Sequence, residues 1–231
     1  TYTIGSGKGD YEKAHIPGAD FLDLQQELSN NTSKLRFTFP SAEHFSKAIG
    51  AHGLSNDNQA ILYSTTSPQW ATRIWWMLRA FGFDNAKVLD GGLIRWVQKG
   101  YPTSTIPSTY PEQSFTAKPR PGLIIQKSEV LEGIHESNTC IINALSQEQH
   151  IGVGGRTYGR PGRIKDSENV PTTELIDPET NEFYPAAVIA ERFASVGTQS
   201  SDRVLTYCGG GIAASATAFL CLLYTSPSPR D

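Results

Sequence analysis

The chain has 231 residues and a net charge of −3 at pH 7, with acidic and basic residues interspersed along it. It is long enough to bury one large core or two ordinary ones. This charge balance lacks the basic clusters that are typical of proteins that bind nucleic acids or anionic membranes. No apolar run approaches the roughly 18 residues of a membrane span. We therefore expect small-molecule partners, with no nucleic acid and no membrane.

The first half of the chain predicts alternating strands and helices. A short apolar run at 59–65 predicts a buried strand, and residues 68–83 carry apolar side chains at helical spacing. Residues 86–92 predict a second strand that ends in a turn, and residues 93–100 predict a helix. This alternation is typical of an α/β fold in which a parallel sheet is covered by helices.

A proline-rich segment separates this half from the next. Five prolines between residues 101 and 121 exclude regular helix and central strand there. We predict an N-terminal domain at 1–105, a linker at 106–121 and a C-terminal domain at 122–223. Residues 224–231 contain two prolines and are predicted to form a tail outside the domain.

The C-terminal domain repeats the alternation of the first. The predicted elements are a helix at 127–134, a strand at 139–145, a helix at 185–197, a strand at 202–208 and a helix at 212–223. The stretch AHIPGADFLD in the first half corresponds to GRIKDSENVP in the second, and QAILYST corresponds to DRVLTYC. This alignment places Ser64 or Thr65 where Cys208 stands in the second copy. Both copies look incomplete, because no strand precedes the first motif and the second copy has no match to AKVLDGGLIRW.

The three cysteines, Cys140, Cys208 and Cys221, lie far apart and show no metal-ligand spacing. Their odd number argues against a disulfide framework, so we expect a reducing compartment, the cytoplasm or alternatively the mitochondrion. The chain opens on Thr1 without a leader sequence, and we expect its true N-terminus to be missing. Cys140 and Cys221 lie in apolar runs typical of a core.

Cys208 has different neighbours, because Gly209, Gly210 and Gly211 follow it at the start of a predicted helix. The N–H groups at a helix N-terminus have no helical partner, and with the helix dipole they favour a thiolate over a thiol. The glycines allow these amides to turn inward without a side chain in the way. We predict that Cys208 is a nucleophile.

Other phosphate or cysteine chemistries fit this loop less well. A cysteine phosphatase needs an arginine that closes the loop on phosphate, but alanines occupy that region. A nucleotide-binding loop ends in Gly-Lys-Ser/Thr, and the segment contains no lysine.

The motifs AHIPGA, LDGGLIRW and CGGGIA, together with the duplication, resemble the tandem-domain rhodanese family, the thiosulfate and 3-mercaptopyruvate sulfurtransferases. The resemblance covers nearly everything from Tyr11 to Leu223. It implies two rhodanese-like domains with the catalytic cysteine in the second alone. The implied active-site loop consists of Cys208, Gly209, Gly210, Gly211, Ile212 and Ala213. The implied reaction is ping-pong, with no metal or organic cofactor: Cys208 takes a sulfane sulfur from a donor, becomes a persulfide and passes the sulfur to cyanide or a thiol.

The charge of the loop bears on the donor. Members of the family that prefer thiosulfate tend to carry basic residues just after the cysteine, so the neutral CGGGIA loop favours 3-mercaptopyruvate. Arg156, Arg160 and Arg163, in a glycine-rich segment, are the candidate donor-binding residues, with Arg160 as the first choice. Arg163 occupies the motif position at which His15 stands in the first copy, where we expect His15 to hold its own loop by hydrogen bonds.

One departure from the family supports an alternative function. Asn143 and Leu145 stand where the family commonly has an aspartate and an arginine, which removes an expected supporting ion pair. With the neutral loop and the missing segments, this leaves open a rhodanese-like binding or regulatory module with little or no turnover.

Overall fold

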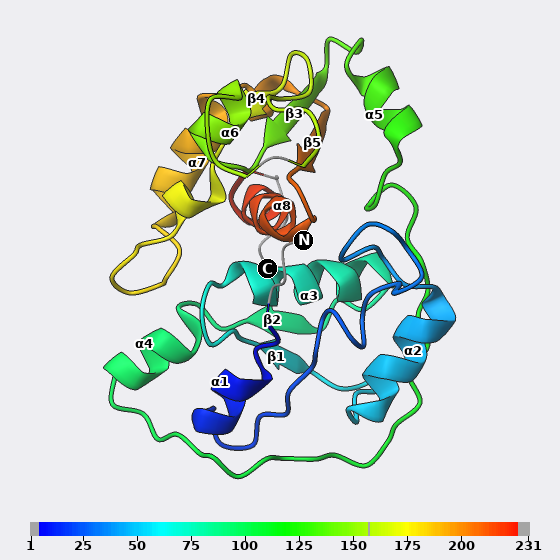
Figure 1. The fold of residues 1–231 in the computed structure, drawn as a ribbon, viewed down its shortest axis with the longest axis vertical. Helices are drawn as coiled ribbons and strands as arrows, with labels where there is room; N and C mark the ends of the chain where they lie inside the picture. Colours follow the sequence, from blue (N-terminus) through cyan, green and yellow to red (C-terminus); the bar gives the residue numbers. More distant parts are fainter. Residues whose placement is uncertain (1–4, 157, 226–231) are drawn as a thin grey trace. The chain divides into compact units, whose positions relative to one another are not determined.

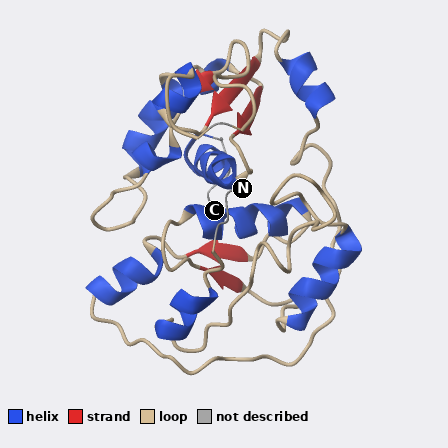
Figure 2. Cartoon of the chain, in the orientation of Figure 1, coloured by secondary structure: helices blue, strands red, loops and turns tan. Residues whose placement is uncertain are grey.

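The structure, a computed structural model, describes residues 5–156 and 158–225. The chain forms two compact units, unit 1 (Thr1–Leu123) and unit 2 (Ile124–Asp231). In each unit parallel strands are accompanied by helices (Figure 1, Figure 2). The predicted α/β class is therefore confirmed. Residues 226–231 of the predicted tail lie outside the described residues.

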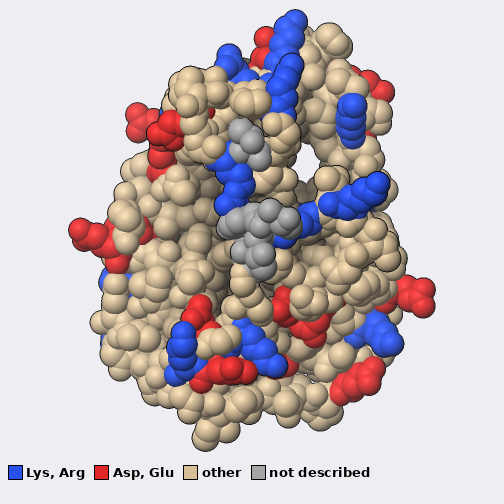
Figure 3. All heavy atoms as spheres, in the orientation of Figure 1, with Lys and Arg blue, Asp and Glu red and all other residues tan. Residues whose placement is uncertain are grey.

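The described surface carries charges of both signs. On the face drawn in Figure 3, Lys and Arg side chains are interspersed with Asp and Glu side chains. Within the ranges 5–156 and 158–225, no helix is both long enough and apolar enough to cross a membrane.

Unit 1 is built on two parallel strands, β1 (Ala60–Leu62) and β2 (Ala86–Val88). The helix α3 (Gln69–Ala80) joins them and packs on both, because its apolar side chains recur at helical spacing and form one buried face. The helix α4 (Gly92–Gln98) begins after a glycine turn in which Gly91 has φ 73°. Two further helices, α1 (Lys8–Lys13) and α2 (Ala42–Ala51), were not predicted from the sequence.

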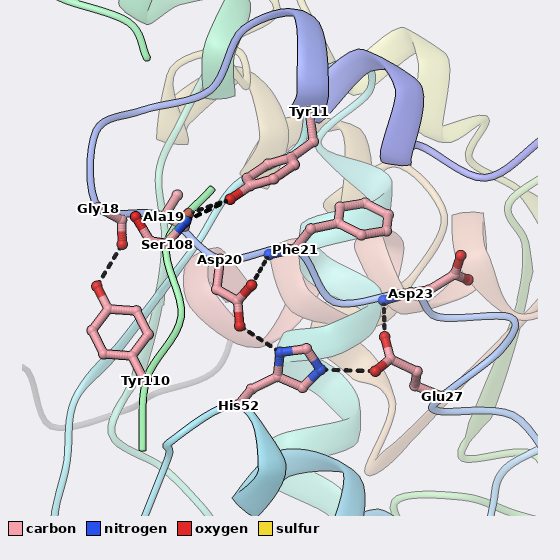
Figure 4. Close-up of polar contacts among 10 residues, drawn as sticks. All are labelled: Tyr11, Gly18, Ala19, Asp20, Phe21, Asp23, Glu27, His52, Ser108 and Tyr110. Carbon is pink, nitrogen blue, oxygen red and sulfur yellow. Dashed lines mark hydrogen bonds and ion pairs between the residues drawn. The ribbon is translucent and has the colours of Figure 1, made fainter. Parts of the chain in front are cut away.

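The proline-rich segment forms neither helix nor regular strand but is attached to unit 1. Figure 4 shows Tyr110 donating to the Gly18 carbonyl, and the Ser108 amide donating to the Tyr11 hydroxyl at 3.2 Å. Further along, Phe115 is buried. The unit boundary follows Leu123, so the predicted linker at 106–121 lies within unit 1. The proline count indicated the lack of helix but not the anchoring contacts, which are made with residues distant in sequence.

Unit 2 contains a parallel sheet in the order β4–β3–β5, formed by β3 (Thr139–Asn143), β4 (Glu168–Asn169) and β5 (Arg203–Tyr207). The central strand, β3, is buried from its second residue onward, which explains its apolar sequence. The helix α8 (Ile212–Thr225) packs on β5 and on α7 (Ala186–Ala194). The remaining elements are α5 (Lys127–Gly133), α6 (Gln147–Ile151), η1 (Thr172–Leu175) and η2 (Thr198–Ser200).

The hydrogen bonds of the two units reproduce the duplication seen in the sequence. The Ile16 amide donates to the Tyr63 hydroxyl at 3.1 Å, and the Ile164 amide donates to the Tyr207 hydroxyl at 3.0 Å. Each bond joins the first motif of a copy to the end of the strand that precedes the loop. Tyr63 therefore corresponds to Tyr207, and the next residue, Ser64 rather than Thr65, corresponds to Cys208.

Candidate active site

Cys208 lies between the end of β5 and the start of α8, at the carboxyl edge of the parallel sheet. The Gly211 amide donates to the Cys208 Sγ at 3.1 Å. Gly211 has φ 81°, a left-handed conformation that side chains disfavour, so glycine is what allows the amide to turn back toward the sulfur. An N–H group directed at the sulfur stabilises negative charge there, in the thiolate and in a persulfide.

The other two cysteines are in the core, as predicted. Cys140 and Cys221 are 7% and 8% exposed, whereas Cys208 is half-buried. Burial, with a further contribution from the nearby Glu168 carboxylate, raises the pKa of the Cys140 thiol to about 11. Cys140 is therefore a protonated core residue at neutral pH, which leaves it a poor nucleophile.

Cys208 opens on a cavity of about 410 Å³ within unit 2. The structure brings the three predicted arginines to this cavity from a single loop between α6 and β4. The basic side chains that line it are Arg156, Arg160, Arg163 and Lys165. The cavity thus combines a half-buried thiol with several exposed cations, a combination suited to a small anion. Within the described parts of the chain, no group of three or more His, Cys, Asp or Glu side chains could hold a metal ion.

Two further residues of the cavity were not recognised as site residues from the sequence. The ring of Tyr158 packs so closely on Gly209 that a Cβ at that position would collide with it. Asn143, at the end of β3, is fully buried and lines the same cavity. An aromatic residue in a glycine-rich loop is a weak sequence signal for a site. Asn143 was noted in the sequence only because it replaces the aspartate that the family commonly has at the end of this strand.

Unit 1 has a cavity of its own, of about 670 Å³, at the end of β1. His52 lies between two carboxylates there: its Nδ1 is 2.6 Å from Asp20 and its Nε2 is 2.9 Å from Glu27 (Figure 4). The hydrogen bond to Glu27, opposed by burial and reinforced by Asp20, raises the pKa of His52 to about 9. Burial alone would raise the pKa of Glu27, but its hydrogen bonds with His52 and the Asp23 amide lower it overall. The cluster ties the chain around Asp20 to the C-terminal end of α2.

Comparison with known proteins identifies the family. A family model described as a rhodanese-like domain matches residues 6–99. The chain is 32% identical over 219 residues to the 3-mercaptopyruvate sulfurtransferase of Rattus norvegicus, and the match covers 92% of this chain and 73% of that protein. The chain belongs to the rhodanese family.

This rhodanese is similar to relatives named for two different donors. It is 29% identical over 224 residues to the thiosulfate sulfurtransferase of Rattus norvegicus, again with 92% of this chain and 73% of that protein covered. It is 30% identical to the crystal structure of a 3-mercaptopyruvate sulfotransferase from Escherichia coli, with a TM-score of 0.83 over 94% of this chain and 81% of that one. The resemblance predicted from the motifs is confirmed.

Proposed function

We propose that this rhodanese is a sulfurtransferase that carries a sulfane sulfur as a persulfide on Cys208. The observation that carries the proposal is the Gly211 amide directed at Sγ, in a loop that opens on a cationic cavity. The C-terminal domain, 122–223, supplies the nucleophile. The N-terminal domain, 1–105, contains no cysteine, and its counterpart of Cys208 is Ser64.

The reaction has two steps that share Cys208 as the sulfur carrier. With 3-mercaptopyruvate, the Cys208 thiolate attacks the donor's sulfur, the carbon–sulfur bond breaks, and the donor's thiol proton ends on the resulting enolate carbon, which gives pyruvate and a persulfide anion. With thiosulfate, the sulfur–sulfur bond breaks and sulfite leaves. Cyanide or an acceptor thiolate then attacks the outer sulfur of the persulfide, which regenerates the Cys208 thiolate.

The loop supplies the electrostatic support for both steps. The negative charge moves from the Cys208 thiolate to the outer sulfur of the persulfide and back. The Gly211 amide donates to the Cys208 Sγ, which carries this charge in the thiolate and is bonded to the charged sulfur in the persulfide. Gly209 leaves room for the Tyr158 ring, which covers this part of the loop. Because the Gly211 amide is already directed at the Cys208 sulfur, it can lower the activation barrier of both sulfur-transfer steps without a rearrangement of the loop.

We propose 3-mercaptopyruvate as the preferred donor, because the loop from Cys208 to Ala213 carries no charge of its own. Arg160, with Arg156 and Arg163, is proposed to bind the single carboxylate of that donor, since a guanidinium matches a carboxylate with two parallel hydrogen bonds. All three line the cavity that Cys208 opens on. The free thiols of the chain fit a reducing compartment, and we propose the cytoplasm.

Intact-mass measurement tests the sulfur-transfer step. The reduced, folded chain is incubated with 3-mercaptopyruvate or, separately, with thiosulfate, and its mass is recorded before and after cyanide is added. We expect a gain of one sulfur atom that cyanide removes, and a faster gain with 3-mercaptopyruvate. Cys208→Ser should gain none, whereas Cys221→Ser, which alters a buried helix residue, should gain it normally.

The alternative, a binding module with little turnover, predicts a different result. In that case the chain keeps its fold, as judged by circular dichroism, but neither donor adds sulfur to Cys208. A gain of sulfur in both the parent chain and Cys208→Ser would instead place the reactive thiol elsewhere and overturn the assignment.

A further inference from the structure

We propose that Ser167 and Tyr207 are positioning residues, whose hydroxyl groups hold the backbone of Ile164 and thereby set where Arg163 enters the Cys208 cavity. This inference rests on the proposed function, because it concerns donor binding at the same site. The two hydroxyl groups act through Arg163, which lines the cavity, rather than by contact with the donor.

The first observation is a closed circuit of hydrogen bonds around Ile164. The Ile164 amide donates to the Tyr207 hydroxyl at 3.0 Å, and the Ser167 hydroxyl donates to the Ile164 carbonyl at 2.7 Å. The two hydroxyl oxygens are 2.8 Å apart. A serine hydroxyl has one proton, which here goes to the carbonyl, so the hydroxyl of Tyr207 donates to Ser167. Both polar backbone groups of Ile164 are therefore held by side chains, and Ser167 is buried, where hydrogen bonds compete little with water.

The second observation is the place of this circuit between the nucleophile and the arginine. Tyr207 ends β5 and directly precedes Cys208, whereas Ile164 directly follows Arg163. Both Arg163 and Cys208 line the cavity of about 410 Å³. The hydrogen bond from Ile164 to Tyr207 spans 43 positions of the sequence. It therefore ties the backbone beside the arginine to the backbone beside the sulfur.

The third observation is the glycine-rich backbone on the other side of Arg163. Gly159 and Gly162 have φ 113° and 100°, and a Cβ built at either position would lie more than 4 Å from every described residue outside its immediate neighbours. Glycines in such open positions leave the backbone many conformations to choose from. The hydrogen bonds at Ile164 therefore restrain a part of the loop that its own sequence leaves free.

The fourth observation is that the circuit distinguishes unit 2 from unit 1. Residues 164–167 correspond to residues 16–19, and in both turns the fourth amide donates to the first carbonyl, at 3.2 Å and 2.9 Å. The third residue is Gly18 in unit 1 but Asp166 in unit 2, whose φ of 58° is a left-handed conformation that side chains disfavour. An alanine stands in unit 1 where unit 2 has Ser167. The copy with the less favourable turn thus carries the additional hydrogen bond that holds it.

The test uses Ser167→Ala, which removes one hydroxyl of the circuit and supplies the residue of unit 1. Persulfide formation is followed by intact mass at a series of 3-mercaptopyruvate concentrations. We expect the half-saturating donor concentration to rise about three- to tenfold, while the rate at saturating donor changes little. Tyr207→Phe, which removes the other hydroxyl, should have the same effect. In an Arg163→Ala background, Ser167→Ala should add little, because the arginine that it positions is gone.

Two further variants separate positioning from a general loss of stability. Tyr63→Phe is the matched control, because it removes the corresponding hydrogen bond to Ile16 in unit 1, and it should leave the half-saturating concentration unchanged. Asp166→Gly, added to Ser167→Ala, makes the left-handed turn favourable again and should restore part of the lost donor affinity.

Three results would overturn the inference. The first is an unchanged half-saturating concentration in folded Ser167→Ala; if that variant does not fold, Tyr207→Phe decides in its place. The second is an equal rise caused by Ser167→Ala with and without Arg163. The third is an Arg163→Ala variant that half-saturates like the parent, since the circuit would then have nothing to position. Failure of the parent chain to form a persulfide is a separate result, which overturns the proposed function itself.

Discussion

The two units share one framework and differ in the loop that it holds. In both, the amide of an isoleucine in the first motif donates to a tyrosine hydroxyl at the end of a strand. In unit 1 the next residue is Ser64, whose Oγ accepts from the amide of Thr66 at 3.1 Å in a local turn. In unit 2 the next residue is Cys208, whose Sγ accepts from the amide three residues on. The comparison indicates that the framework positions the loop, whereas the loop sequence decides whether sulfur chemistry is available.

The units also differ in what lies beside the strand that leads to this loop. In unit 2, β3 lies between β4 and β5, and Leu205 of β5 is 7% exposed. In unit 1, the segments that correspond to β4 and β5 are residues 20–21 and β1, and both border the 670 Å³ cavity. The counterpart of Leu205 is Ile61, which is 64% exposed. Burial of these two apolar residues is therefore decided by the neighbouring segment and not by the residue type.

The largest effect is expected when the residues at the corresponding positions of the two units are exchanged. Cys208→Ser should lower sulfur transfer by roughly 10³-fold or more, because the nucleophile is lost. Adding Ser64→Cys to that variant should restore none of it. The segment that follows Ser64, residues 65–68, contains no glycine, and the amide that donates to the Ser64 Oγ belongs to Thr66, only two residues on. Persulfide formation, followed by intact mass, measures both effects. Restoration by Ser64→Cys would mean that the framework alone suffices.

A second prediction separates the roles of His15 and Arg163, which occupy corresponding motif positions. His15 is fully buried, and its ring nitrogens contact the carbonyls of Tyr11 at 2.8 Å and Ile106 at 2.9 Å. We expect His15→Ala to lower the free energy of unfolding of unit 1 by about 2–4 kcal/mol, because buried polar groups lose their partners. Arg163 is exposed and lines the Cys208 cavity. Arg163→Ala should change stability by less than about 0.5 kcal/mol and should instead weaken donor binding.

The measurement for this pair is urea unfolding followed by tryptophan fluorescence, together with donor binding. All four tryptophans, Trp70, Trp75, Trp76 and Trp96, belong to unit 1, so their fluorescence reports the unfolding of that unit. Equal losses of stability for His15→Ala and Arg163→Ala would contradict the division of roles.

The smallest predicted effect is a pH dependence that belongs to unit 1. The pKa of His52 is raised from its ordinary value of 6.5 to about 9 by Glu27 and Asp20. Its contribution to stability is therefore fully present below pH 6.5 and is lost as the pH rises through about 9. With allowance for solvent screening, we expect a loss of roughly 1–2 kcal/mol over that range. Tryptophan fluorescence in urea at pH 6 and at pH 10 measures it.

The control for this prediction is His52→Gln, which keeps a polar side chain but removes the titrating group. This variant should show a smaller loss of unit 1 stability between the two pH values. An equal loss in the parent chain and in His52→Gln would show that another group is responsible.

Several features of the protein were determined by short stretches of its sequence. Apolar runs and helical spacing predicted α3, β3, β5 and α8 close to their observed bounds, because such patterns act within one element. The strand predicted at 59–65 contains β1, which is shorter and ends at Leu62. Cys140 and Cys221 were predicted to be buried from their apolar neighbours, and they are. The three glycines after Cys208 predicted a loop with inward amides, and the Gly211 amide does point at the sulfur. A run of glycines affects the backbone locally, which is why it can be interpreted without a fold.

Other features were decided only by the tertiary structure. The strand β4 is two residues long and exists through its pairing with β3, so its own sequence carries little signal. Phe115 anchors the proline-rich segment through ring contacts with Phe45 and Phe83, which lie far away in the sequence. Asn143 and Tyr158 meet Cys208 at one cavity because strand register and loop packing bring them there across more than 45 residues of chain. The nucleophile and its loop were therefore determined locally, whereas the groups that surround a substrate depended on contacts between segments far apart in the chain.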